Sequence, residues 1–314
     1  MTISRRGFLG TAPAGLAVLD RLMAAPPKLP AGCRDAMLRE LGQPDCWSAA
    51  KSVGAEVLEV TVDDKFSLPL LQHPQGPYSV ASEEEIKRLS GDLKAAGLKI
   101  SAFCVASRFD ARPDFEVEFG AKLARIAQQL GIKAIRIDVV SYKLKIDQFL
   151  DPAVDAVKKL IAATEGTSVR FGVENHGPSG NNPAFMSPLL DRVGSKRLGV
   201  TLDTGNLYWF GHPLSKVYEL IETFAPHVVH THCKNIRYPA DQREVQRPMG
   251  WEYAKYEAPI DQGDIDFVRV VKILRAASYA GDLCVENEAL RRLPESERAG
   301  VLGKEIAYLK RLRG

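Results

Sequence analysis

Short apolar runs rich in valine and isoleucine alternate with longer amphipathic segments along most of the chain. Such runs are typical of buried parallel strands. The segments between them repeat apolar side chains at helical spacing, as Ile86, Leu89 and Leu93 do. Strands are expected at residues 31–34, 57–60, 99–104, 134–138, 170–174, 198–203, 228–232 and 282–286. Eight strand–helix alternations in one domain predict an α/β fold, a single (β/α)8 TIM barrel.

A doubly wound open sheet is the alternative architecture for this pattern. It is disfavoured because neither a GxGxxG nor a GxxxxGK[ST] phosphate-binding motif follows an early strand. The length of 314 residues, 45% of them hydrophobic, suits one large core. The formal net charge of +3, without long runs of like charge, does not indicate a nucleic-acid or membrane surface.

Capping residues mark the expected ends of the helices. Ser82 and Glu85 have the spacing of a capping box, which predicts a helix start. Four glycines each stand between a helical run and a strand, where positive φ favours glycine. They are Gly54, Gly97, Gly131 and Gly281.

The last four predicted strands each end on a residue that can bind a metal: Glu174, Asp203, His232 and Glu286. A barrel brings these ends together at one rim, where its chemistry is located. Three carboxylates crowded there would repel one another, and a divalent cation removes that conflict. The mostly oxygen set suits one Mn²⁺, Mg²⁺ or Co²⁺, with Zn²⁺ as an alternative. Each residue alone could equally be a cap or a surface residue, but four in strand order favour a metal site.

The stretch HVVHTHCKN carries two histidines on the same side of one strand. His232 lies at the rim and is the expected ligand. His230 lies one layer deeper, where a hydrogen-bonded imidazole that supports the site is the expectation.

The motifs GVENHG, LDTGN, HTHCKN and GDIDF…GDLCVE, taken in order, resemble the xylose-isomerase-like TIM-barrel superfamily, which includes the sugar phosphate isomerase/epimerase family. The resemblance covers roughly residues 30–312. It implies that Glu174, Asp203, His232 and Glu286 bind one catalytic metal, and that the two glutamates transfer protons through a metal-held enediolate. The family commonly ends the third motif with HLKD, whereas this chain has Asn235 in place of the acid.

Other polar residues flank this site. The resemblance suggests that His176, Asn206 and Lys234 contact substrate hydroxyl groups; loop hydrogen bonds are the alternative. Trp209 could stack on a sugar face or pack against the start of a helix. Residues 235–262 form a long loop, expected to be a lid or a contact of a homodimer.

The resulting expectation is a metal-dependent sugar isomerase or epimerase. A lyase or dehydratase acting on a keto-sugar or an oxidised glycoside would use the same chemistry and is the main alternative. An AP endonuclease is disfavoured, because that branch uses three zinc ions and several more histidines than the six present here. A non-catalytic sugar-binding barrel could lose its proton-transfer residues, yet both glutamates are present.

The N-terminal residues 1–25 suggest export. Arg5 and Arg6 precede a short apolar stretch, as in Tat-type signal peptides, so the protein is expected to be periplasmic or extracellular. Phosphorylated sugars are scarce outside the cytoplasm, which favours a non-phosphorylated substrate. The stretch is too short to span a bilayer, so no stable membrane insertion is expected. The five cysteines lack CxxC spacing and are expected to be small buried residues without disulfides.

Overall fold

The structure, a computed structural model, describes residues 28–313. The expected signal peptide at residues 1–25 lies outside this range and stays a prediction. Within residues 28–313, no helix is long and apolar enough to cross a membrane.

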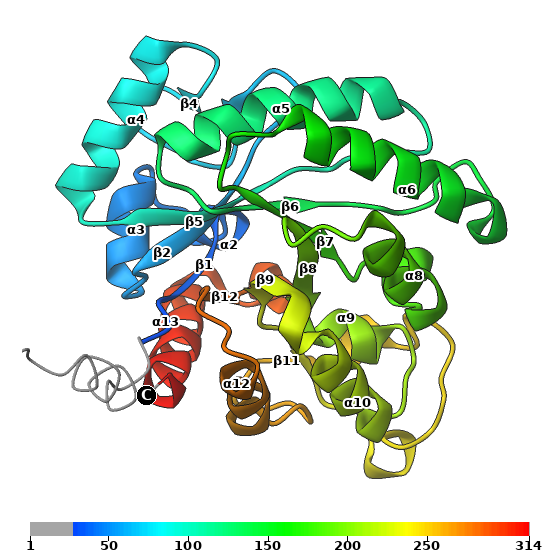
Figure 1. The fold of residues 1–314 in the computed structure, drawn as a ribbon. Helices are drawn as coiled ribbons and strands as arrows, with labels where there is room; N and C mark the ends of the chain where they lie inside the picture. Colours follow the sequence, from blue (N-terminus) through cyan, green and yellow to red (C-terminus); the bar gives the residue numbers. More distant parts are fainter. Residues whose placement is uncertain (1–27, 314) are drawn as a thin grey trace, which may run out of the picture.

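Eight parallel strands form a nearly closed barrel with an outer layer of helices (Figure 1). The strands are β1 (Ala31–Arg34), β2 (Val57–Thr61), β5 (Lys99–Cys104), β6 (Ala134–Ile137), β7 (Arg170–Glu174), β8 (Leu198–Asp203), β9 (Val228–His232) and β12 (Leu283–Val285). Their order is β12-β1-β2-β5-β6-β7-β8-β9. The circle is completed just beyond β9, where Cys233 bridges Val285 in parallel. The predicted (β/α)8 barrel is therefore confirmed, and the strand bounds differ from the prediction by one residue at most.

Helices connect the strands and cover the outside of the barrel (Figure 1). The longer ones are α4 (Glu83–Ala96), α5 (Pro113–Gln129), α6 (Ile146–Ala163), α8 (Pro183–Val193), α10 (Leu214–Phe224), α12 (Phe267–Ala276) and α13 (Glu295–Leu312). Short elements are α2 (Asp35–Arg39), α3 (Cys46–Ser52), α7 (Gly177–Gly180), α9 (Thr204–Trp209), α11 (Tyr253–Tyr256), η1 (Ala225–His227), η2 (Ala240–Gln242) and η3 (Glu288–Arg292). Two small hairpins pair β3 (Ser67–Leu68) with β4 (Tyr78–Ser79), and β10 (Asn235–Ile236) with β11 (Glu257–Ala258).

The predicted helix start is confirmed at Ser82, the N-cap of α4, with the serine half of the capping box formed. The hydroxyl oxygen of Ser82 accepts the Glu85 N–H at 3.3 Å, and Ile86, Leu89 and Leu93 of that helix are buried.

The predicted state of the cysteines is also confirmed, because all five lie within the described residues and are buried and free.

Three of the four predicted positive-φ glycines are confirmed: Gly54, Gly97 and Gly131 have φ values of 71°, 70° and 73°. The prediction for Gly281 is wrong, because α12 ends earlier and Ser278 takes the positive φ of 61°.

Gly281 is required for a close approach instead. The N–H groups of Ser278 and Tyr279 close the end of α12 on the carbonyls of Arg275 and Leu274. A Cβ at Gly281 would lie 2.3 Å from the hydroxyl of Tyr279. The missing side chain therefore leaves room for that hydroxyl, which donates to the carbonyl oxygen of Asp282 at 2.7 Å.

The long segment 235–262 packs over α9 as an aromatic layer. Tyr238 is buried and contacts the rings of Tyr208, Trp251 and Tyr256 at centroid distances of 4.8, 5.6 and 5.6 Å. The guanidinium of Arg247 lies 4.3 Å from the Tyr238 ring centroid. These contacts hold part of the segment against α9, and both the expected lid and the expected homodimer contact stay predictions.

Candidate metal centre

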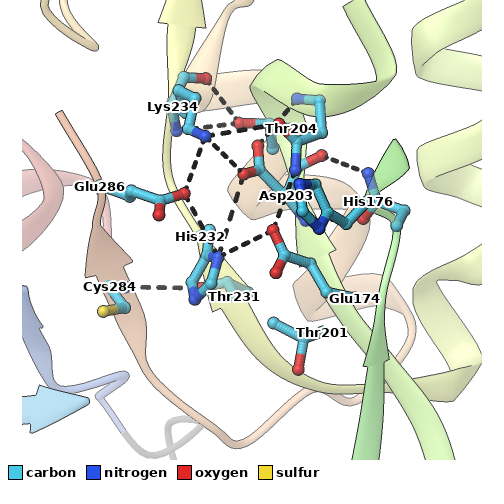
Figure 2. A network of polar contacts seen from close by, with 12 residues as sticks. Glu174, His176, Thr201, Asp203, Thr204, Thr231, His232, Lys234, Cys284 and Glu286 are labelled. Carbon is cyan, nitrogen blue, oxygen red and sulfur yellow. Dashed lines mark hydrogen bonds and ion pairs between the residues drawn. The ribbon is translucent and has the colours of Figure 1, made fainter. Parts of the chain in front are cut away.

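The four predicted ligands meet at the carboxyl ends of β7, β8, β9 and β12 (Figure 2). Glu174, Asp203, His232 and Glu286 are all buried, and one ligand atom from each lies within 4.8 Å of the others. Residues that are up to 112 positions apart (286 − 174) thus converge on one small volume. The juxtaposition expected from the strand ends is present.

Each carboxylate in this cluster has one oxygen bound to an arginine or to a backbone N–H and the other turned toward Nδ1 of His232. Glu174 Oε2 is paired with Arg136, and Glu286 Oε1 is paired with Arg34. Asp203 Oδ1 caps α9 by accepting the Asn206 N–H at 2.8 Å. The three remaining oxygens, which belong to different strands, lie 3.4, 3.4 and 3.9 Å from His232 Nδ1. The four groups are therefore oriented toward one point.

His232 is oriented by a carboxylate that the strand-end rule did not select. Glu59, buried on β2, places both carboxylate oxygens 3.0 Å from His232 Nε2. A carboxylate behind a metal-binding imidazole fixes the ring and its tautomer. Because Nε2 faces Glu59, the nitrogen free to serve the cluster is Nδ1.

His230 is a buried, hydrogen-bonded imidazole, as expected, and its role in supporting a metal site stays a prediction. Its Nδ1 lies 2.7 Å from Asp282 Oδ1, and its Nε2 lies 3.2 Å from Glu59 Oε1. Burial lowers the pKa of His230, but the charges of Asp282 and Glu59 outweigh this effect and raise it to about 9. A buried chain of acid and imidazole groups thus runs from Asp282 through His230 and Glu59 to His232.

Cations balance the three carboxyls of the centre unequally. Burial raises the pKa of Glu174 and of Glu286, but Arg136 and Lys234, respectively, outweigh this effect and hold both pKa values below their usual range. Burial raises the pKa of Asp203 to about 7, and the nearby Glu286 and Glu174 carboxylates add to the rise while Lys234 opposes it. Asp203 Oδ2 and Glu286 Oε2 are buried and receive no hydrogen bond within the described part of the chain. Two carboxylate oxygens without hydrogen-bond donors, beside a histidine nitrogen, suit a bound cation.

Lys234 reaches the same carboxylates from the end of β9. Its Nζ lies 2.8 Å from Glu286 Oε2, 3.1 Å from Asp203 Oδ2 and 3.3 Å from Glu288 Oε1. These are ion-pair distances, although the angles to Asp203 Oδ2 and Glu286 Oε2 do not make hydrogen bonds. Burial lowers the pKa of Lys234, but the three carboxylates outweigh it and hold the pKa well above its usual range.

The mouth of the centre is a small pocket of about 140 Å³. Its lining residues are His176, Asn206, Trp209, Tyr253 and Glu288. Two of the three residues expected to bind substrate, His176 and Asn206, therefore face this pocket, whereas Lys234 lies below it among the carboxylates. Asn206 Nδ2 donates to Glu174 Oε1 at 2.9 Å, and His176 Nδ1 lies 3.1 Å from Asp138 Oδ1.

Sequence reasoning missed the residues that hold the cluster from the first half of the barrel. Arg34 ends β1, Glu59 lies within β2, and Arg136 and Asp138 lie in and just after β6. Arg34 and Asp138 stand at the ends of predicted strands, where the rule applied to the last four strands would have found them. Glu59 and Arg136 lie inside their strands, where the rule does not apply, and only a charge within an otherwise apolar run marks them. Asn175 was also missed; its side chain joins the ends of β7 and β8 by bonding the backbone of Asp203 at 2.7 and 2.8 Å.

Asn235, the departure from the family pattern, has a structural role. Its buried amide donates to the carbonyls of Ile260 and Ile265 at 2.9 Å each. Its oxygen accepts the N–H groups of Ile236 and Ile265 at 2.9 and 3.0 Å. An aspartate could not donate these bonds, so the amide is required to tie the start of the long segment, at β10, to residues 260 and 265 at its far end.

Asn235→Asp is expected to lower the free energy of unfolding by about 2–4 kcal/mol, because it turns a buried carboxylate toward two carbonyl oxygens. Urea denaturation measures this loss. The matched control is Asn182→Asp, at the N-cap of α8, where the side chain only accepts the Ala184 N–H and aspartate caps equally well. Equal stability of the two variants would contradict the role given to Asn235.

Comparisons with known proteins agree with this architecture. A structure of the IolI protein with a bound zinc atom is 15% identical, with a TM-score of 0.65 over 90% of this chain and 98% of that one. D-allulose 3-epimerase from Methylomonas sp., in complex with D-allulose, is 14% identical, with a TM-score of 0.63 over 92% and 99%. Likeness at these identities concerns the fold.

At the level of sequence, an uncharacterised protein of Methanocaldococcus jannaschii is 24% identical over 156 residues. That match spans about half of each chain, 48% of both. The profile of the xylose isomerase-like TIM barrel matches residues 47–312, which includes the strands that carry all four cluster residues. The chain belongs to the xylose isomerase-like TIM-barrel family.

Proposed function

We propose that the protein is a divalent-metal-dependent sugar isomerase or epimerase acting on a non-phosphorylated sugar or sugar derivative. The observation that carries the proposal is the convergence of three carboxylate oxygens on His232 Nδ1 at 3.4–3.9 Å. Glu174, Asp203, His232 and Glu286 would hold the ion. A divalent ion there supplies the Lewis acidity that weakens a C–H bond beside a substrate carbonyl.

Glu174 and Glu286 are the residues placed to move protons. They come from β7 and β12 and lie on opposite sides of His232 (Figure 2). One removes the proton next to the carbonyl, and the other returns a proton to the opposite face or to the adjacent carbon. Return to the opposite face gives an epimer, and return to the adjacent carbon gives an isomer. The two-sided arrangement is what such a reaction needs.

The charges around the mouth favour a substrate without a phosphate group. Among the described residues at the centre, the cations Arg34, Arg136 and Lys234 are each already paired with carboxylates. Glu288 adds a partly exposed carboxylate to the pocket lining. A phosphate group entering the pocket would therefore be repelled by the Glu288 carboxylate, and these three cations are already paired. Neutral hydroxyl groups, by contrast, can bond Asn206 and His176.

Solvent-deuterium exchange tests this proposal. The purified protein, loaded with Mn²⁺, Mg²⁺, Co²⁺ or Zn²⁺, is incubated in D₂O with free ketoses and aldoses, and NMR follows the C–H bond beside the carbonyl. Deuterium uptake with formation of an isomeric sugar is the expected result. Release of water or of an aglycone from a keto-sugar or oxidised glycoside would indicate a lyase instead. No exchange with any metal and sugar would overturn the proposal.

A further inference from the structure

Lys234 occupies an unusual place for a lysine, inside the candidate metal centre. It follows His232 by two residues, so both side chains extend to the same side of the chain. Its side chain is 5% exposed, and its ammonium faces the carboxylates of Asp203 and Glu286 (Figure 2). The carboxylate of Glu288 also lies within ion-pair distance of the ammonium. Burying a lysine is costly unless it is paired, so these contacts account for its position.

The ammonium and the histidine face the same two oxygens. Asp203 Oδ2 lies 3.1 Å from Lys234 Nζ and 3.9 Å from His232 Nδ1. Glu286 Oε2 lies 2.8 Å from Lys234 Nζ and 3.4 Å from His232 Nδ1. Two of the three carboxylate oxygens oriented toward the proposed ligand nitrogen are therefore already in contact with a positive charge.

Two further acceptors surround the ammonium away from His232. Glu288 Oε1 lies 3.3 Å and Asn206 Oδ1 3.4 Å from Lys234 Nζ. Glu288 lies at the partly exposed mouth, where its other oxygen accepts the Tyr253 hydroxyl at 2.8 Å. The ammonium of Lys234 therefore lies between two sets of acceptors. Asp203 and Glu286 belong to the proposed metal ligands, whereas Glu288 and Asn206 do not.

We propose that Lys234 is a resident cation that balances Asp203 and Glu286 when no metal is bound and competes with the metal for these carboxylates. This inference rests on the proposed metal site. Because the ammonium already satisfies part of the negative charge, the metal-free barrel stays folded. For the same reason, the binding free energy of a divalent ion is smaller than it would be without the lysine, so the metal is exchangeable. Glu288 favours metal binding by offering the ammonium an acceptor outside the ligand set.

Metal titrations of four variants test the competition. Metal-stripped wild type, Lys234→Met and Glu288→Gln are titrated with Mn²⁺, Mg²⁺, Co²⁺ and Zn²⁺ by calorimetry, and thermal unfolding is recorded with and without metal. The exposed ion pair Lys216–Glu219 on α10, at 2.8 Å, provides matched controls. Lys216→Met and Glu219→Gln make the same changes in net charge away from the centre.

Lys234→Met is expected to bind metal at least about tenfold more tightly, because it removes a positive charge that lies 2.8 and 3.1 Å from two proposed ligand oxygens and repels the ion. Its metal-free form should melt at a lower temperature than wild type, and saturating metal should close that gap. Glu288→Gln should bind metal more weakly, and the two α10 variants should behave as wild type.

Three results would contradict either the competition or the proposed metal site. Unchanged or weaker binding by Lys234→Met, while wild type binds metal, would overturn the competition and leave the metal site standing. If Lys234→Met does not fold, unchanged or tighter binding by Glu288→Gln would overturn the inference in the same way. If neither wild type nor any variant binds metal, the proposed function itself fails.

Discussion

Replacing Glu174 or Glu286 with glutamine is expected to lower turnover by about 10³-fold or more while the barrel stays folded. Glutamine keeps the shape of the side chain but cannot accept a proton at neutral pH. Each glutamate pairs one oxygen with an arginine, Arg136 or Arg34, which fixes the carboxylate in place at the centre, where it would transfer the proton. Steady-state kinetics on the substrate found by deuterium exchange gives the loss.

Deuterium exchange separates the roles of the two glutamates. The variant that lacks the proton-removing group should lose both exchange and product formation. The variant that lacks the proton-returning group should still exchange the C–H bond beside the carbonyl. Glu116→Gln is the control, because Glu116 is a buried carboxylate that bonds Arg108 and Arg112 away from the cluster. A fully active variant at position 174 or 286 would contradict the proton-transfer assignment.

The barrel and its four-residue cluster could be predicted because both depend on local patterns. Buried strands appear as apolar runs, and parallel strands in a closed barrel put their carboxyl ends at one rim. Glu174, Asp203 and His232 each stand at the last position of a strand, and Glu286 follows the last residue of β12. Their convergence then follows from topology alone.

The supporting contacts could not be predicted in the same way, because they depend on register across the barrel. His232 meets Glu59 over a separation of 173 residues. The pairing of β2 with β5 shifts register between Leu58 and Glu59, and that of β8 with β9 shifts between Val200 and Thr201. A shift of one residue turns a side chain to the opposite face of a strand. The layer at which Glu59 meets the imidazole is therefore a property of the folded barrel.

The end of α12 illustrates the same limit at short range. A glycine near a helix end predicts positive φ, yet Ser278 has it and Gly281 does not. The helix stops at Ala276, and the Tyr279 hydroxyl packs where a Cβ of Gly281 would lie. Gly281 is therefore required because the Tyr279 hydroxyl lies against its backbone, and not because its φ is positive. The local sequence pattern is the same for both requirements and does not distinguish them.

Asp203→Ala is expected to remove the metal from the protein. Elemental analysis should find about one Mn, Mg, Co or Zn per chain in wild type and none in the variant, because the buried Oδ2 of Asp203 is lost from the ligand set. The change also removes the cap of α9, which costs about 1 kcal/mol. Asp266→Ala, which removes the similar cap of α12, is the control and should keep its metal.

The number of ions in the wild-type protein decides between functions. One ion, absent from Asp203→Ala, supports a centre built from four strand ends and the enzyme proposed above. Three zinc ions would favour the nuclease branch of the fold. No metal after reconstitution would mean that Glu174, Asp203, His232 and Glu286 are balanced by Arg34, Arg136 and Lys234 alone. In that case a buried network of ion pairs is the whole role of the cluster, and the proposed enzyme activity falls with the metal.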